Sequence, residues 1–222
     1  MKTASGACIS AERCYFDRKT RNSRKDSVFM EKKDTALLII DMQRDFVQPE
    51  SPLHVAGAAA TVPAIARLLA ECRRRRDVAI FHIVRSYEPD GCDVERCRRE
   101  LFQRTPCMVR GTAGTEIMPE LAPLPEETVI VKPRFSAFFH TKLDLCLRAL
   151  GVDHLLIAGT QYPNCIRGTV TDALSHDYRV TVVSDCCSAK TPEVAAANLT
   201  DMANLGARCL TLEEWLAQEK RS

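Results

Sequence analysis

Short apolar runs of strand length recur along most of the chain. They cover residues 36–41, 78–84, 128–132, 154–159, 179–184 and 208–211. Most are continuous rather than alternating, which is typical of strands that are covered on both faces in a parallel sheet. Segments with helical periodicity separate them, at residues 57–75, 139–150, 165–177 and 192–205. Strands that alternate with helices predict an α/β fold in three layers, with helices flanking an open parallel sheet.

The beginning of the chain differs from this pattern. Residues 1–34 are polar and charged, with little periodicity. We therefore expect an N-terminal extension outside the fold, either mobile or laid over a neighbouring surface. A chain of 222 residues is compatible with one or two domains. Residues 35–222 show no internal repeat, and we interpret them as a single domain.

Charge and composition narrow the class of protein. The formal net charge of +2 gives no electrostatic reason to expect a nucleic-acid partner. No run approaches the roughly 18 apolar residues of a membrane-spanning helix, and the N-terminus lacks the apolar segment of a secretory signal. We therefore expect a cytoplasmic protein with no membrane partner. Its eleven cysteines form no paired CxxC motifs, and we expect most of them to be reduced and buried.

Three residues with useful chemistry stand where predicted strands end. Asp41 ends the first apolar run, Lys132 ends the third, and Cys165 follows the fourth after one tight turn. Each residue taken alone also has a structural explanation. Asp41 could cap the next segment, Lys132 could be a solvated strand end, and Cys165 could simply pack in the core. Ligands of open parallel sheets bind beyond the carboxyl ends of the strands. The joint placement of the three residues at this edge favours a functional interpretation.

The three side chains together suit nucleophilic catalysis. A thiol with an ordinary pKa of about 8.5 is mostly protonated at neutral pH. A nearby carboxylate can take its proton, and a lysine ammonium stabilises both anions. Backbone N–H groups at the beginning of the following helix can bind the oxyanion that forms when the sulfur attacks a carbonyl. The sequence therefore predicts acyl transfer to a cysteine, followed by hydrolysis.

Three stretches around these residues resemble the signatures of isochorismatase-like cysteine hydrolases, a family that includes nicotinamidase-related amidohydrolases. They are "LLIIDMQRDF" (37–46), "KPRFSAFF" (132–139) and "GTQYPNCIRGTVTDA" (159–173), and "RGTAGTEIMPEL" (110–121) and "VVSDCCSA" (182–189) fit the intervening pattern. The resemblance covers roughly residues 35–216. It implies an open six-stranded parallel sheet flanked by helices, and a homodimer or homotetramer.

The resemblance also implies roles for particular residues. Asp41, Lys132 and Cys165 would form the catalytic triad of the family. The backbone N–H groups of Gln161 and Cys165 would form its oxyanion hole, and the peptide bond between Thr160 and Gln161 would be cis. Asp45, four residues beyond Asp41, is expected to hydrogen-bond turn amides.

Four further residues are candidates for contact with a small-molecule substrate: Phe46, Arg85, Phe138 and Tyr162. Phe46 suits either a pocket wall or the core. Arg85 follows the second predicted strand, and it is either a surface arginine or a guanidinium clamp on a substrate carboxylate or carbonyl. Three roles are open for Arg167, one turn into the following helix. It could bind substrate, pair across a subunit interface or be solvated.

The same resemblance limits the chemistry. Nicotinamidase members carry a metal site with an Asp-x-His element after the second strand, where this chain has "RSYEPDGCDVERC" (85–97) without histidine. We therefore expect no metal and no cofactor. Cys165 argues against the vinyl-ether chemistry of an isochorismatase proper. These features favour hydrolysis of a small C–N substrate, an amide, ureido or carbamoyl compound.

Two other functions stay open. "PNCIR" (163–167) resembles a subgroup with plant members described as inactive nicotinamidases, so a non-catalytic binding or scaffolding protein is an alternative. The adjacent Cys186 and Cys187 suggest thiol redox chemistry as a third interpretation.

Overall fold

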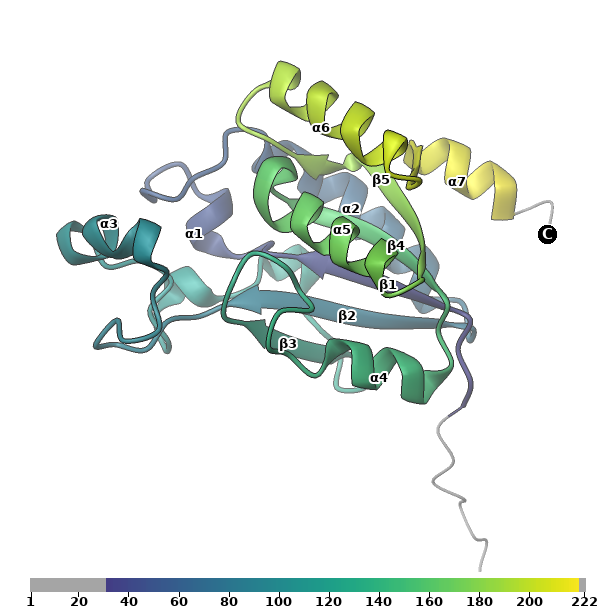
Figure 1. The fold of residues 1–222 in the computed structure, drawn as a ribbon, viewed down its shortest axis with the longest axis horizontal. Helices are drawn as coiled ribbons and strands as arrows, with labels where there is room; N and C mark the ends of the chain where they lie inside the picture. The colour runs from purple at the N-terminus through teal and green to yellow at the C-terminus, as the bar shows by residue number, and fades with distance from the viewer. Residues whose placement is uncertain (1–30, 220–222) are drawn as a thin grey trace, which may run out of the picture. The chain divides into compact units, whose positions relative to one another are not determined.

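A computed structural model describes residues 31–219 and contains a six-stranded sheet (Figure 1). Its strands are β1 (Thr35–Ile40), β2 (Val78–Arg85), β3 (Thr128–Lys132), β4 (His154–Thr160), β5 (Arg179–Ser188) and β6 (Arg208–Leu210). Their order is β3-β2-β1-β4-β5-β6, and every neighbouring pair is parallel. The predicted α/β fold with an open six-stranded parallel sheet is confirmed.

Helices cover both faces of the sheet. The longer helices are α2 (Ala58–Arg73), α4 (Leu143–Leu150), α5 (Arg167–Ser175), α6 (Pro192–Asn204) and α7 (Leu212–Glu219), and the short ones are α1 (Arg44–Val47) and α3 (Arg99–Arg104). Buried side chains of α4, α5 and α6 belong to one hydrophobic cluster, and those of α2 and α7 belong to the other. Figure 1 shows α4 and α5 in front of the sheet and α2 behind it.

The two-sided covering explains the continuous apolar runs. In β1, Leu38 and Ile40 pack into one cluster, whereas Leu37 and Ile39 pack into the other. Successive strand residues point to opposite faces, so a strand buried on both sides needs apolar residues at every position. The outermost strand β3 differs, because Val129 and Val131 are exposed.

The four predicted helices are all present, as α2, α4, α5 and α6, but their predicted ends were less accurate. Residues 139–142 are not helical, and α4 begins at Leu143. There the Thr141 hydroxyl donates to the Ala137 carbonyl oxygen at 2.6 Å and accepts from the Leu143 backbone nitrogen at 3.1 Å. This side-chain bonding competes with helix formation. Helices α1, α3 and α7 were not predicted.

The predicted N-terminal extension lies almost entirely outside the described residues. Of residues 1–34, the structure describes 31–34. The Lys33 backbone nitrogen donates to the Leu150 carbonyl oxygen at 2.9 Å, and that of Asp34 donates to Asp77 at 3.0 Å. Residues 33 and 34 are thus bonded to the domain. Between residues 31 and 219, no helix has the length and apolar character needed to cross a membrane.

A buried acidic group joins the end of α2 to the sheet. Both Glu127 carboxylate oxygens accept hydrogen bonds from Arg73, at 2.7 and 2.9 Å. The His82 ring nitrogen lies 2.8 Å from the same carboxylate, and the Leu124 backbone N–H donates to it at 3.0 Å. Burial alone would raise the pKa of Glu127, but these hydrogen bonds, led by that from Arg73, lower it to about 2.

Replacing Glu127 by Gln should therefore destabilise the fold. A carboxyl group with a lowered folded-state pKa stabilises the protein above its unfolded-state pKa, and that contribution is lost as the pH falls through the folded value. We expect Glu127→Gln to lower the free energy of unfolding at pH 7 by about 2–3 kcal/mol. The difference should shrink as the pH approaches 2. Urea denaturation measures both, with the exposed Glu126→Gln as the control. Equal losses of unfolding free energy in the two variants would contradict the stabilising role of the Glu127 hydrogen bonds.

Candidate active site

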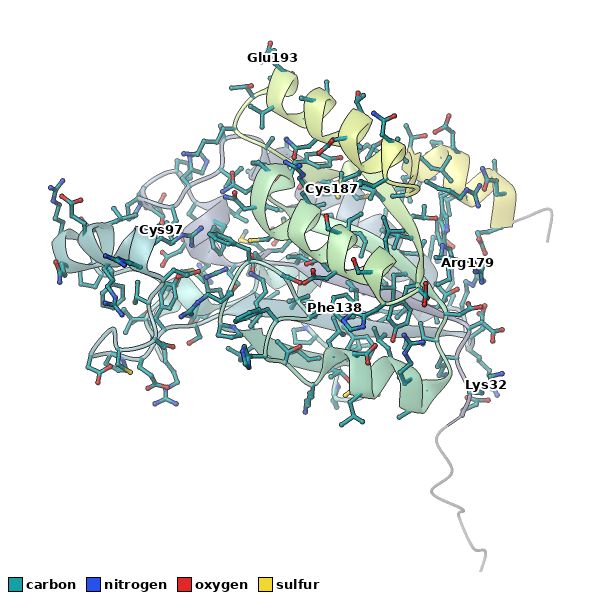
Figure 2. The ribbon with its side chains drawn as sticks, in the orientation of Figure 1. Lys32, Cys97, Phe138, Arg179, Cys187 and Glu193 are labelled. Carbon is teal, nitrogen blue, oxygen red and sulfur yellow. The ribbon has the colours of Figure 1, made fainter. Side chains whose placement is uncertain are left out.

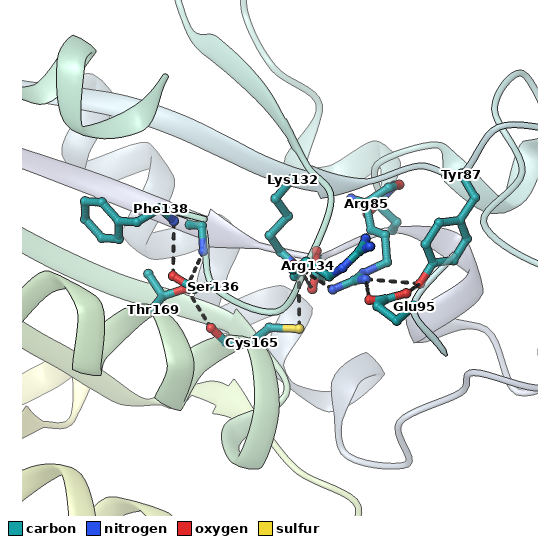
Figure 3. A network of polar contacts seen from close by, with 12 residues as sticks. Arg85, Tyr87, Glu95, Lys132, Arg134, Ser136, Phe138, Cys165 and Thr169 are labelled. Carbon is teal, nitrogen blue, oxygen red and sulfur yellow. Dashed lines mark hydrogen bonds and ion pairs between the residues drawn. The ribbon is translucent and has the colours of Figure 1, made fainter. Parts of the chain in front are cut away.

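The carboxyl ends of four adjacent strands bring the predicted triad together (Figure 3). Lys132 is the last residue of β3, Arg85 is the last residue of β2, and Asp41 directly follows β1. Cys165 lies in the turn after β4. The Lys132 Nζ atom lies 2.8 Å from Asp41 Oδ2 and 3.5 Å from Cys165 Sγ. Lysine thus contacts both other members of the proposed triad.

The backbone around β1 and β4 permits this convergence. Asp41 has a left-handed φ of 54° and donates its N–H to the Ile83 carbonyl oxygen at 2.8 Å. Gly159 has a φ of 122°, and a Cβ there would lie 2.1 Å from the Ile40 carbonyl oxygen. Only glycine allows β4 to approach the end of β1 this closely. The expected cis peptide bond between Thr160 and Gln161 is confirmed.

Cys165 occupies a π-helical turn, Tyr162–Ile166, that leads into α5. The Gln161 carbonyl oxygen accepts hydrogen bonds from the backbone nitrogens of Asn164 and Ile166, at 3.3 and 3.2 Å. Short π-helical segments are rare and occur frequently at functional sites. This turn places the thiol toward Lys132 (Figure 3). The predicted oxyanion-hole role of the Gln161 and Cys165 N–H groups stays a prediction.

Burial dominates the electrostatics of the thiol. Cys165 is 2% exposed, and burial raises the pKa of its thiol above the ordinary value. The negative charge of Asp41 raises this pKa further, whereas the positive charges of Lys132 and Arg85 lower it. The net effect is upward, so the thiol is protonated at neutral pH. Besides its ion pair with Lys132, the Asp41 carboxylate interacts with the Cys165 thiol, so it is placed to accept the thiol proton.

Arg85 is fully buried, so it is not a surface arginine. Its guanidinium contacts the Glu95 carboxylate, the Tyr87 hydroxyl at 3.0 Å and the Arg134 carbonyl oxygen at 2.8 Å. The Gln43 side chain holds the Arg85 backbone N–H and carbonyl oxygen, at 2.7 and 2.8 Å. Glu95 was not predicted as part of the site, because it lies in a segment without periodicity. Contact between Arg85 and substrate stays a prediction.

Thr169 was also missed and connects two parts of the site. Its hydroxyl donates to the Cys165 carbonyl oxygen at 2.7 Å and accepts from the Ala137 backbone N–H at 3.0 Å. The side chain is fully buried (Figure 3). A threonine one helical turn after a candidate nucleophile is the available sequence signal, because its hydroxyl reaches the carbonyl four residues earlier.

The three predicted aromatic residues make packing contacts. Phe46 and Tyr162 are 2% and 1% exposed, and the Tyr162 hydroxyl donates to the Ser184 carbonyl oxygen at 2.9 Å. The ring of Phe138 stacks on that of His176, with centroids 5.2 Å apart, and points away from the triad (Figure 3). Their roles toward a substrate stay predictions. The expected turn contact of Asp45 is present, since its Oδ2 accepts from the Met108 N–H at 2.6 Å.

A surface hollow of about 440 Å³ lies beside the candidate nucleophile turn. Residues 134–136 and Phe139 line one side of it, and Pro163, Asn164 and the beginning of α5 line the other. Arg167 contributes to this lining and also pairs with Asp201 at 2.7 Å. Neither Lys132 nor Cys165 lines the hollow, which borders the segments that carry them.

The adjacent cysteines Cys186 and Cys187, which suggested redox chemistry, lie in the buried part of β5. Cys186 and Cys187 are free and buried, and burial raises the pKa of both thiols. Figure 2 shows Cys187 between the sheet and its covering helices, whereas Cys97 lies near α3 at the periphery. Within the described part of the chain, no group of three or more His, Cys, Asp or Glu residues is arranged to hold a metal ion.

Comparison with known proteins identifies relatives of this chain, and these relatives agree with the fold described above. The isochorismatase domain matches residues 35–214. A probable inactive nicotinamidase of Arabidopsis thaliana is 43% identical over 187 residues, covering 82% of this chain and 95% of its own. The maleamate amidohydrolase of Pseudomonas putida is 32% identical over 170 residues, covering 75% and 78%.

A solved structure shows the same architecture. The crystal structure of an isochorismatase family protein from Desulfovibrio vulgaris superimposes with a TM-score of 0.79 at 51% identity, covering 82% of this chain and 96% of that one. The chain therefore belongs to the isochorismatase family. Its three-layer α/β sheet is the fold of that family.

The Thr169 bridge generates a stability prediction. Thr169→Val leaves a buried carbonyl oxygen and a buried N–H without their partner, which should lower the free energy of unfolding by about 1–3 kcal/mol. Thr169→Ser keeps the hydroxyl and should recover most of the loss. Thr171→Val is the matched control, because its hydroxyl donates to the Arg167 carbonyl oxygen at 2.9 Å on the exposed side of the same helix. If denaturant unfolding showed equal losses of unfolding free energy for Thr169→Val and Thr171→Val, the Thr169 bridge would not contribute to stability.

Proposed function

We propose that this protein is a cysteine-dependent hydrolase of a small C–N substrate, an amide, ureido or carbamoyl compound. The observation that carries the proposal is the position of the Lys132 ammonium, 2.8 Å from Asp41 and 3.5 Å from the Cys165 sulfur in a buried strand-end site. Similarity to a maleamate amidohydrolase supports the reaction type. The proposed reaction proceeds through a thioester.

In the first half-reaction, Cys165 attacks the carbonyl carbon while its proton passes to Asp41. The raised pKa of the thiol favours this coupled transfer over a thiolate formed beforehand. The N–H groups of Gln161 and Cys165 stabilise the tetrahedral oxyanion. When the C–N bond breaks, the departing nitrogen takes the proton back from Asp41. Ammonia or an amine leaves, and the acyl group remains on the sulfur.

In the second half-reaction, a water molecule attacks the thioester. Asp41 accepts one proton of this water, and the acyl–sulfur bond breaks as the carboxylic or carbamic acid forms. The sulfur then recovers a proton from Asp41. Lys132 remains an ammonium throughout and offsets the negative charge that moves between Asp41 and Cys165. The cycle consumes one water molecule and requires no redox change.

A non-catalytic binding protein is the second candidate. The observation in its favour is that the Cys165 thiol is only 2% exposed, and the Arabidopsis relative is described as a probable inactive nicotinamidase. That description concerns nicotinamide, whereas the proposed substrate class is wider. The two candidates differ in whether an acyl group ever becomes bound to Cys165.

Loss of turnover in triad variants separates the two candidates. In a panel of small amides, ureido acids and carbamoyl compounds, at least one should release ammonia. Cys165→Ala, Asp41→Asn and Lys132→Met should each lower kcat/KM by about a thousandfold or more. Mass spectrometry should find the acyl adduct on Cys165. Cys97→Ala is the control and should keep wild-type activity, because this exposed cysteine lies outside the site. Undiminished activity in Cys165→Ala would exclude the mechanism.

The raised pKa of Cys165 gives a separate prediction for the free enzyme. Alkylation by iodoacetamide requires the thiolate. Because burial raises the pKa of the thiol above its ordinary value, the labelling rate of Cys165 should still be rising at pH 9. Peptide mass spectrometry at several pH values measures this rate. A rate that levels off below pH 8 would show instead that Lys132 and Arg85 outweigh burial.

A further inference from the structure

Two buried ion pairs lie next to each other at the strand ends. Lys132 pairs with Asp41, and Arg85 pairs with Glu95. Their side chains are 0%, 1%, 0% and 5% exposed, respectively. Lys132 Nζ and Arg85 Nη2 donate to the same acceptor, the Arg134 carbonyl oxygen, at 3.2 and 2.8 Å. The second pair is therefore part of the same site as the triad (Figure 3).

Glu95 is held in place by both of its carboxylate oxygens. One contacts Arg85 Nη1, and the other accepts a hydrogen bond from the Tyr87 hydroxyl. Burial raises the pKa of Tyr87, which keeps the phenol in its proton-donating form. Glu95 thus supplies a fixed negative charge to Arg85 without contacting Cys165. The positive charge of Arg85 nevertheless reaches the sulfur, since it lowers the pKa of that thiol.

The four buried groups balance, with two positive and two negative charges. A substrate carboxylate entering this region would be an additional buried anion, and an uncompensated buried charge is costly. A neutral carbonyl or amide oxygen avoids this cost and can accept the Arg85 Nε–H, which has no partner within residues 31–219. The charge balance therefore favours a neutral ligand.

Two further cations of the network, Arg98 and Arg134, lie nearer to solvent. Arg98 is partly buried, and its Nη1 donates to the Tyr87 hydroxyl at 3.4 Å. Arg134 is only partly buried, and its Nη1 donates to the carbonyl oxygens of Asp93 and Pro133, at 2.9 and 2.6 Å. It also lines the surface hollow. Solvent screens a charge at this position more strongly than a buried one. Arg98 and Arg134 therefore act on the sulfur less strongly than the four buried groups do.

We propose that Glu95 determines specificity by neutralising Arg85, so that the site accepts C–N substrates whose acyl part carries no charge. This inference rests on the proposed nucleophilic role of Cys165. It assigns to this chain a substrate class that differs in charge from maleamate, which is a carboxylate. If the negative charge of Glu95 is removed, the positive charge of Arg85 is no longer compensated. The site should then prefer anionic ligands.

Alkylation of Cys165 by a neutral and an anionic reagent tests the inference on the full-length protein. Iodoacetamide and iodoacetate react alike: the sulfur forms a bond to the CH₂ carbon, iodide leaves, and the thiol proton is lost. Both rates depend in the same way on the thiolate fraction of Cys165, so this fraction cancels in the ratio of the two rates. The ratio therefore reports the charge preference of the site. Peptide mass spectrometry gives the ratio at Cys165, and N-acetylcysteine at the same pH gives the reference.

Wild-type Cys165 should favour iodoacetamide more strongly than N-acetylcysteine does. Glu95→Gln should shift the ratio toward iodoacetate by about tenfold or more, as expected for one buried charge within several ångströms. The double variant Arg85→Met/Glu95→Gln is neutral again and should return to the wild-type ratio. Glu100→Gln is the control, because this exposed residue pairs with Arg104 on the nearby α3 and should change nothing.

The wild-type protein alone can overturn the inference. It would do so if its rate ratio equalled that of N-acetylcysteine or were shifted toward iodoacetate. An unchanged ratio in a folded Glu95→Gln protein, with circular dichroism like that of the wild type, would overturn it as well. Neither measurement requires amide turnover. Failure of the amide panel would therefore count against the proposed hydrolase, whereas failure of the charge preference counts only against the role of Glu95.

Discussion

The ammonium group of Lys132 is the interaction on which the site depends. It contacts a carboxylate from β1 and a sulfur from the turn after β4, and so connects segments that lie far apart in the chain. Burying a lysine without partners is costly, and here Asp41 supplies the countercharge. The parallel sheet makes this contact possible, because its strands end at one edge and each delivers a residue to the same place.

The fold and the triad were predictable because both depend on regular features. Two-sided burial produces continuous apolar runs, and the carboxyl ends of such strands must meet, so the convergence of Asp41, Lys132 and Cys165 followed from their positions. Glu95 and Thr169 were not predictable in this way. Glu95 reaches Arg85 through an irregular segment after β2, and the Thr169 bridge depends on the loop around Ala137 folding back over α5.

The protonation state of the thiol shows a second limit of sequence-based inference. The sequence places a lysine and a helix N-terminus near Cys165, and both favour the thiolate. It does not reveal how completely the thiol is removed from water, and this removal is the largest influence on its pKa. The structure therefore indicates that the Cys165 thiol is harder to deprotonate than its neighbours in the sequence suggest.

Lys132 belongs to the outermost strand of the sheet. β3 pairs only with β2 and exposes Val129 and Val131, so within the described chain it has less support than any central strand. Local opening requires less free energy where few apolar contacts must break. The lysine that contacts both Asp41 and the sulfur is thus carried by an edge strand with fewer apolar contacts than the central strands. Fraying of this edge would withdraw the lysine charge from both Asp41 and Cys165, which lie on central segments of the sheet.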